Sequence, residues 1–347
     1  MSDSLEYFVL DVFTETRLAG NPLAVFPNAA GVSAETMQSI AREMNLSETT
    51  FVERRDPVTE RAEGVRTRIF TTEEELPFAG HPTLGTASLL RAIAPECISE
   101  CVSQYISMIG DDSADDLKPG ELRPGDHKPG KLEPGEWVRL ALNVGTIPVR
   151  FKPRSTAESP WPARGEMTQR DPEFLAELDR STVAAIIGLE EEDLDPERPV
   201  QIVSTGTAFA IVPLWSASSL SRLRVRQEEA RAYLRPLGAR WFYVLGPETD
   251  PRHNSLPPWR ARMQFHGGED PATGSAAGCA ISYLVAHGAV PSEQKIHLRQ
   301  GIEIGRPSDL FLSAKLLPPK PLGGLVVGEV RVAGSTVLVA KGTLFLP

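Results

Sequence analysis

Two segments of the sequence place a glycine-containing turn before a helix-like run, and together they predict a site for an anion. ELPFAGHPTLGTASLL covers residues 75–90, and EDPATGSAAGCAISYL covers 269–284. The turns contain Gly80 and Gly274, and small and apolar residues follow each of them. The first turn of a helix has backbone N–H groups without partners and carries the positive end of the helix dipole. A carboxylate can therefore bind there without Arg or Lys.

The two segments also repeat each other in detail. An alignment of Glu75 with Glu269 superposes Pro77 on Pro271 and Gly80 on Gly274. A strand-like stretch that begins with arginine precedes each copy, RIF from residue 68 and RMQF from residue 262. Either copy alone is also typical of an ordinary helix start with a glycine cap. The paired repetition favours two helix starts, one per domain, that face a shared cleft.

The rest of the chain predicts the strands and helices that must position these turns. Alternating apolar and β-branched residues predict strands at 7–13, 23–26, 48–54, 65–70, 137–151, 201–214 and 241–246, and a hairpin at 330–346. Helical periodicity predicts helices at 34–44 behind the N-cap Ser33, from about 82, at 181–189 and 227–238, and before Gly288. The segment 137–151 is expected to lead into the second domain.

Composition and charge narrow the function classes. The net charge is −10, from 36 basic and 46 acidic residues, which argues against a nucleic-acid-binding face. No apolar run approaches the ~20 residues that a membrane span needs, and the first residues lack the pattern of a secretory signal. Three cysteines, Cys97, Cys101 and Cys279, favour reduced thiols and a cytoplasmic protein. We expect these cysteines to be structural.

Residues 111–135 differ from the rest of the chain in composition. Pro-Gly pairs recur every five residues with charged residues between them, and large apolar side chains are almost absent. Such a segment cannot build a core. We expect a solvated surface insertion, with a motif for a partner as the alternative.

Five motifs together resemble a known family. They are AGNPLAVF (19–26), MNLSETTFV (44–52), ELPFAGHPT (75–83), EDPATGSA (269–276) and QGIEIGRPS (300–308). They occur in the order of the PhzF-type phenazine-biosynthesis family and span nearly the whole chain. The resemblance implies the diaminopimelate-epimerase fold: an α+β protein with two similar domains, each a curved, mostly antiparallel sheet around a central helix.

The resemblance also implies a division of the chain and an active site. We expect residues 1–143 plus 333–347 to form the N-terminal domain and residues 144–332 the C-terminal domain, with the active site in the cleft between them. A homodimer is implied by the family.

The resemblance assigns the chemistry to a small set of side chains. Glu48 is the matched acid/base, and burial in a closing cleft would raise its pKa. His81 and Asp270 match the other catalytic positions, with His81 contacting a substrate amine or hydroxyl. The substrate carboxylate would be bound by Ser275 and the amides of the two turn glycines. Asn21 is expected to line the entrance.

Several features depart from the family and its relatives. Related racemases carry a cysteine at each helix start, whereas this sequence has Ala79-Gly80-His81 and Thr273-Gly274-Ser275. A two-thiol racemisation is therefore not expected. The loop before EDPATGSA is short, Thr72 replaces a usual proline, and the insertion at 111–135 is additional. These departures concern the substrate more than the fold.

The sequence thus predicts a cofactor-independent isomerase that moves a proton on a small cyclic or amino carboxylate. Trans-2,3-dihydro-3-hydroxyanthranilate is the substrate of the family's best-known activity. A non-catalytic carboxylate-binding or regulatory protein on the same scaffold is the alternative, and an amino-acid racemase or epimerase is a weaker one. No phosphate loop, dinucleotide fingerprint or HExxH motif is present, so we expect no cofactor and no metal.

Overall fold

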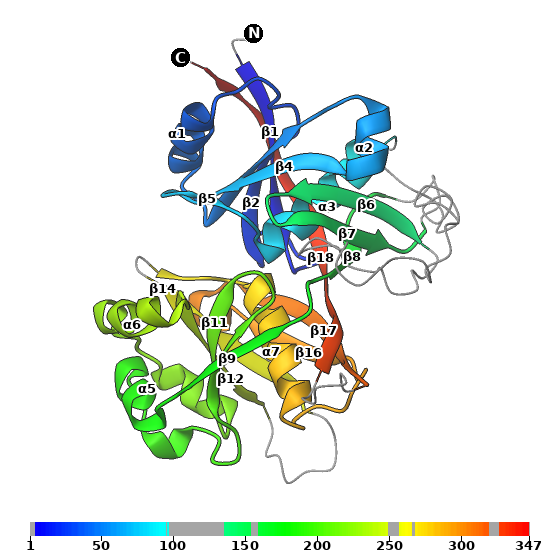
Figure 1. The fold of residues 1–347 in the computed structure, drawn as a ribbon. Coiled ribbons are helices and arrows are strands. Elements are labelled where there is room, and N and C mark those ends of the chain that lie inside the picture. The colour runs from blue at the N-terminus through cyan, green and yellow to red at the C-terminus, as the bar shows by residue number, and fades with distance from the viewer. Residues whose placement is uncertain are drawn as a thin grey trace.

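The computed structural model describes residues 4–94, 96, 135–153, 159–248, 257–265, 268–318 and 326–346. Cys97, Cys101 and all but the last residue of the predicted insertion at 111–135 lie outside these ranges. The described part folds as two halves with central helices α3 (Gly80–Ile93) and α7 (Gly274–Ala286) (Figure 1).

The first half contains the predicted elements and three that the sequence analysis did not predict, α2 (Pro57–Glu63), β5 (Glu75–Leu76) and β8 (Ala163–Thr168). Its strands and helices are β1 (Ser4–Val12), β2 (Asn21–Phe26), α1 (Ala34–Met44), β3 (Glu48–Glu53), α2 (Pro57–Glu63), β4 (Val65–Phe70), β5 (Glu75–Leu76), α3, β6 (Glu136–Leu142), β7 (Gly145–Phe151) and β8 (Ala163–Thr168). The Ser33 side chain accepts a hydrogen bond from the Thr36 amide and caps α1, as predicted. Helix α1 ends at Asn45, which adopts the left-handed conformation with φ 50°. Only Leu46 and Ser47 then separate it from β3.

The first sheet closes on itself around α3. Its strand order is β1-β2-β3-β4-β6-β7-β8-β18, and β18 (Val326–Phe345) also pairs with β1. Helix α3 contacts strands on all sides of this ring, including β1, β3, β7 and β18. The helix is buried from Gly80 to Arg91, as expected for a helix that forms the centre of a core.

The second half repeats this plan. Its elements are β9 (Glu173–Leu178), α5 (Arg180–Ile187), η2 (Glu191–Asp193), β10 (Val200–Ser204), β11 (Ala208–Pro213), η3 (Ala217–Arg222), α6 (Gln227–Leu234), η4 (Arg235–Leu237), β12 (Trp241–Pro247), β13 (Trp259–Arg262), β14 (Gln264–Phe265), β15 (Gly268–Glu269), α7, β16 (Ile296–Gln300), η5 (Ile302–Ile304) and β17 (Ser308–Leu317). The sheet order is β18-β17-β16-β13-β12-β11-β10-β9, and α7 packs against β10, β11, β17 and β18.

Strand directions confirm that the two halves are alike. Most neighbouring strands are antiparallel, but β2–β3 and β4–β6 are parallel in the first half. In the second half β11–β12 and β13–β16 are parallel, at the corresponding places. The predicted fold class is therefore confirmed: an α+β protein with two similar sheets, each wrapped around a central helix. No helix in the described ranges is both long and apolar enough to span a membrane.

The predicted hairpin at 330–346 is wrong, because this segment is one continuous strand. Strand β18 pairs with β17 and β8 in its first part and with β1 from Thr336 onward, so it runs through both halves (Figure 1). Gly334 lies within this strand. In the structure it makes room for the Phe13 ring, since a Cβ there would lie 2.3 Å from the ring's Cδ1 atom.

Strand pairings favour a crossing between the halves later than the boundary expected at residues 143 and 144. Strands β6 and β7 form a hairpin across the expected boundary at residues 143 and 144, and α3 packs against both β7 and β8. We therefore propose that the first domain continues through β8 and that the crossing lies at residues 169–172. The alternating pattern of 137–151 predicts strands but carries no information about which sheet they join.

Candidate active site

The two central helices begin against each other. A Cβ added to Gly80 would lie 2.6 Å from the Gly274 carbonyl carbon and from the Ser275 amide nitrogen, so the two helix starts are in backbone contact. The N-cap residues Ala79 and Thr273 make no side-chain hydrogen bond to either helix. Amides of both first turns and both positive helix ends therefore converge. This arrangement suits an anion, and carboxylate binding itself stays a prediction.

Glu48 is the first residue of β3, where it pairs with Leu23 of the parallel strand β2. Its side chain is 16% exposed, and its Oε2 atom lies 3.5 Å from Nε2 of His81. Among the described residues, this buried oxygen accepts no hydrogen bond. Burial, and after it the nearby charge of Asp270, raises the pKa of Glu48 well above its ordinary value. A carboxylate with a raised pKa is a stronger base than an ordinary one, and its acid form is more stable.

His81, the second residue of α3, is buried, and its contact with Asn21 bears on its tautomer. Its Nδ1 atom lies 3.1 Å from Nδ2 of Asn21. An amide nitrogen does not accept, so this contact favours an Nδ1 atom without a proton and a ring proton on Nε2, which faces Glu48. Burial lowers the pKa of His81 to about 3, so the ring is neutral at physiological pH. The imidazole therefore presents an N–H group beside the free oxygen of Glu48.

Asn21 begins β2 and bridges the two halves from a fully buried position. The two N–H protons of its Nδ2 atom go to Oδ1 of Asp270 and to the Ala272 carbonyl oxygen, both at 2.8 Å, so the contact with His81 at 3.1 Å has no proton of its own. The Ala272 carbonyl can only accept, which determines the orientation of the amide. The sequence placed Asn21 at an entrance. Its burial between His81 and Asp270 favours a positioning role.

Asp270 follows β15 and is almost entirely buried. Its Oδ1 atom accepts from Asn21 and its Oδ2 atom accepts from the Thr273 hydroxyl at 2.6 Å. Burial raises the pKa of Asp270 to about 6, although hydrogen bonds from Thr273, Asn21 and Ser47 oppose the rise. Both carboxylate oxygens of Asp270 thus accept hydrogen bonds, whereas the Oε2 atom of Glu48 accepts none among the described residues. This contrast favours Glu48 as the proton carrier and Asp270 as a supporting charge.

The structure places the remaining predicted residues in the same region. Ser275 is the second residue of α7 and is buried next to Gly80. All seven predicted site residues, Asn21, Glu48, Gly80, His81, Asp270, Gly274 and Ser275, therefore lie around the junction of the two helix starts. Their roles in binding and catalysis stay predictions.

Cys279 lies inside α7 and away from this junction. It is fully buried, and its Sγ atom is 3.5 Å from the Thr205 hydroxyl. Burial raises the pKa of the Cys279 thiol to about 11, so it is a poor nucleophile at neutral pH. In the described ranges no group of three or more His, Cys, Asp or Glu side chains is arranged to hold a metal ion.

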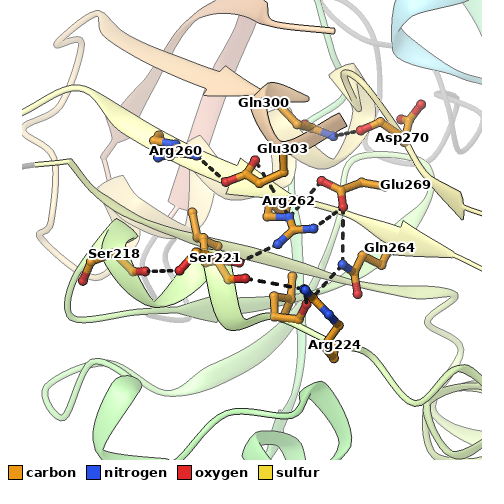
Figure 2. Close-up of polar contacts among 12 residues, drawn as sticks. Ser218, Ser221, Arg224, Arg260, Arg262, Gln264, Glu269, Asp270, Gln300 and Glu303 are labelled. Atoms are coloured by element: carbon orange, nitrogen blue, oxygen red, sulfur yellow. Dashed lines mark hydrogen bonds and ion pairs between the residues drawn. The ribbon is translucent and has the colours of Figure 1, made fainter. Parts of the chain in front are cut away.

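Two ion pairs that the sequence analysis did not identify support the turns before the helices. Arg68 binds Glu75 through two hydrogen bonds of 2.9 and 2.6 Å, and Arg262 binds Glu269 in the same way at 2.9 and 2.5 Å. In both copies the glutamate comes seven positions after the arginine. Figure 2 shows the second pair, in which Glu269 immediately precedes Asp270. The repeated spacing was the available signal.

Comparisons with known proteins agree with this site and fold. The family described as "Phenazine biosynthesis-like protein", PhzC-PhzF, matches residues 10–108 and 129–342. A trans-2,3-dihydro-3-hydroxyanthranilate isomerase from Pseudomonas aeruginosa is 33% identical over 349 residues, covering 98% of this chain and 99% of that protein. An uncharacterized isomerase from Mesorhizobium japonicum is 32% identical and covers 98% of both chains.

A solved structure gives the same result. A predicted epimerase from Pseudomonas aeruginosa matches with a TM-score of 0.70 and 30% identity, over 99% of this chain and 100% of that one. Sequence and structure therefore identify the same group of proteins across almost the full length. The chain belongs to the phenazine biosynthesis-like family, PhzC-PhzF, and is an isomerase of the PhzF type.

Proposed function

We propose that this isomerase moves a proton between two carbons of a small cyclic or amino carboxylate, with Glu48 as the acid/base. The observation that carries the proposal is the free Oε2 atom of Glu48, which lies 3.5 Å from the N–H of the neutral His81 and close to two converging helix starts. The compound named for the Pseudomonas relative, trans-2,3-dihydro-3-hydroxyanthranilate, is the first substrate to test.

In the proposed mechanism the substrate carboxylate binds the first-turn amides of α3 and α7 and the hydroxyl of Ser275. His81 donates its Nε2–H to an amine or hydroxyl of the substrate. The carboxylate of Glu48 then takes a proton from a carbon near the bound acid group, and the electron pair of that C–H bond moves into the conjugated system. Glu48 returns the same proton to a second carbon, so that the product is an isomer and the enzyme is regenerated.

The environment of Glu48 supports both half-reactions. Its raised pKa makes the carboxylate a stronger base and keeps the acid form stable enough to carry the proton between the two carbons. Asp270 holds a negative charge nearby, with both oxygens bonded by protein donors. It therefore contributes to the pKa of Glu48 without competing for the substrate proton.

The test is turnover of trans-2,3-dihydro-3-hydroxyanthranilate by the wild type and by Glu48→Gln, followed by proton NMR in deuterated water. We expect the variant to lose about 10²- to 10⁴-fold in kcat, the usual contribution of a positioned acid/base. Glu53→Gln is the matched control, because Glu53 ends the same strand and, among the described residues, forms ion pairs with Arg66 and Arg68. Equal turnover by Glu48→Gln would remove Glu48 from the mechanism.

Binding measurements separate the alternatives. If neither wild type nor variant turns over any cyclic or amino carboxylate but both bind one, the chain is a carboxylate-binding protein on the isomerase scaffold. If deuterium enters the α-carbon of an amino acid, the racemase alternative is supported. A homodimer and a cytoplasmic location stay predictions from the sequence, and light scattering on the purified chain measures the first of these.

A further inference from the structure

Gln300 lies directly beneath the Asp270 turn, and no part of the proposed mechanism uses it. It is the last residue of β16 and the first residue of the QGIEIGRPS motif, and its side chain is fully enclosed at 1% exposure. A glutamine amide buried to this extent costs free energy unless its donors and acceptor are satisfied. The contacts that satisfy it therefore show what the residue holds in place.

The Gln300 amide makes four hydrogen bonds, and three of them go to the turn from Asp270 to Thr273. Its Oε1 atom accepts from the Thr273 amide at 3.1 Å and from the Tyr243 hydroxyl at 2.9 Å. Its Nε2 atom donates to the Asp270 carbonyl oxygen at 2.8 Å, as Figure 2 shows, and to the Thr273 hydroxyl at 2.9 Å. Because a backbone N–H only donates and a carbonyl only accepts, only one orientation of the amide is possible.

This orientation determines which way the Thr273 hydroxyl points. The Thr273 oxygen accepts from Nε2 of Gln300, so the proton of the hydroxyl is free to donate in another direction. The Oδ2 atom of Asp270 lies 2.6 Å from that oxygen and accepts this proton. The hydrogen bonds thus run in a single direction, from the Gln300 amide through the Thr273 hydroxyl to the Asp270 carboxylate.

The backbone of the residue after Gln300 also packs against the Asp270–Thr273 turn. Gly301 has φ 76°, and a Cβ there would lie 2.6 Å from the Pro271 carbonyl oxygen. No other residue type fits this close approach without displacing the turn. The Gln-Gly pair therefore holds the Asp270–Thr273 turn by side chain and by backbone.

We propose that Gln300 is a positioning residue that directs the Thr273 hydroxyl onto the Asp270 carboxylate. Asp270 in turn faces four groups from different elements: Glu48 on β3, His81 on α3 through Asn21, Glu269 on β15 and Tyr243 on β12. Loss of the directed hydrogen bond removes a contact that stabilises the ionised form of Asp270. This inference rests on the proposed function only in its last step, the effect of Asp270 on the reaction at Glu48.

The experiment is a carbon-13 NMR titration of aspartate carboxyls in the full chain, with the Asp270 signal assigned from Asp270→Asn. The pKa of Asp270 is about 6 in the wild type. We expect Thr273→Val and Gln300→Met each to raise it by roughly 0.5 to 1, the equivalent of one ordinary hydrogen bond. Thr273→Ser keeps the hydroxyl and is expected to restore the wild-type titration.

A double-variant cycle separates direction from general support. If Gln300 acts through the hydroxyl, Gln300→Met combined with Thr273→Val titrates like Thr273→Val alone. Full additivity, or an unchanged Asp270 titration in Gln300→Met, overturns the proposal. Tyr243→Phe removes one bond to Gln300 on the acceptor side, so it is expected to leave the Asp270 titration in place.

The Thr273→Val titration and the pH profile of kcat/KM ensure that every outcome supports or refutes the proposal. If Gln300→Met does not fold, an unchanged titration in Thr273→Val still refutes the proposal, because the hydroxyl would then not donate to Asp270. If the Asp270 titration moves while the pH profile of kcat/KM stays fixed, Gln300 positions Asp270 as stated and the proposed role of Asp270 in the reaction fails. If the Asp270 titration and the pH profile of kcat/KM shift to higher pH by the same amount, the positioning role of Gln300 and the role of Asp270 in the reaction are both supported.

Discussion

Because the two helix starts are in contact, we expect Gly80→Ala and Gly274→Ala to have unequal effects, although the two glycines have similar sequence contexts. An alanine at position 80 would place its Cβ 2.6 Å from two backbone atoms of α7, where ordinary contact begins at 3.4 Å, so the helix starts must separate by about 0.8 Å. An alanine at position 274 would meet the Gly80 Cα and the Phe13 ring at 3.1 Å. There a movement of about 0.3 Å suffices.

These displacements set the expected magnitudes. Backbone atoms of a buried helix cannot rotate away, so Gly80→Ala should cost the overpacking penalty of about 1–3 kcal/mol in the free energy of unfolding. The better helix propensity of alanine offsets at most ~1 kcal/mol of this. If the two helix starts bind the substrate acid group, a displacement of nearly 1 Å should also lower kcat/KM by about 10²-fold. For Gly274→Ala we expect less than ~1 kcal/mol and less than about tenfold.

Urea unfolding followed by tryptophan fluorescence measures the first quantity, and steady-state turnover measures the second. Gly268→Ala is the matched control, because among the described residues a Cβ on this residue of the same half would meet the Phe265 ring alone, at 3.8 Å. A stable Gly80→Ala protein with wild-type kcat/KM would refute the assignment of the helix starts to the site. Greater damage from Gly274→Ala than from Gly80→Ala would refute the geometric reasoning.

Three more predictions follow from burial and hydrogen bonding. The pKa of His81 is near 6.5 in the unfolded chain and about 3 in the folded one, so between these pH values the unfolded state binds one more proton. The wild type should therefore lose up to about 1.4 kcal/mol of unfolding free energy per pH unit on acidification through this range. His81→Gln should remove this loss, as measured by urea unfolding at pH 4, 5 and 7. Asn21→Leu removes the amide nitrogen that faces Nδ1 of His81 and disfavours a proton there, so nitrogen-15 NMR of the ring should show a mixture of tautomers. A single unchanged tautomer would contradict the assignment. Glu269→Gln should cost about 3–5 kcal/mol of unfolding free energy, because the side chains of the Arg262–Glu269 pair are each only 6% exposed. Glu75→Gln should cost about 1 kcal/mol or less, because the side chains of the Arg68–Glu75 pair are 17% and 26% exposed. Equal costs would show that burial does not decide the difference.

Sequence reasoning was most successful where a local signal suffices. The Ser33 cap, the alternating strands and the glycine-led helix starts depend on neighbours within a few residues, and the structure has them at the predicted places. Helix α3 begins two residues earlier than predicted, at Gly80, because the helix accommodates Pro82 within its first turn.

The sequence was misleading where a residue responds to a distant partner. The segment 330–346 was predicted as a hairpin, but Gly334 within it lies in β18 and accommodates the ring of Phe13, more than 300 residues away in the chain. The hairpin of β6 and β7 has an alternating pattern that fits either sheet. Pairing partners for such strands are chosen by the packing of the whole domain.

By itself the sequence determined the duplicated plan, the family and the set of residues that meet at the junction, because repeated motifs and glycine positions are written in the chain. Only the tertiary structure decided how those residues act on one another. The proton on Nε2 of His81, the buried bridge of Asn21 and the hydrogen bonds from Gln300 to Asp270 join segments between 30 and 249 residues apart. The direction of a hydrogen bond and the pKa of a buried group depend on which partners surround them in space, and no spacing along the chain specifies these partners.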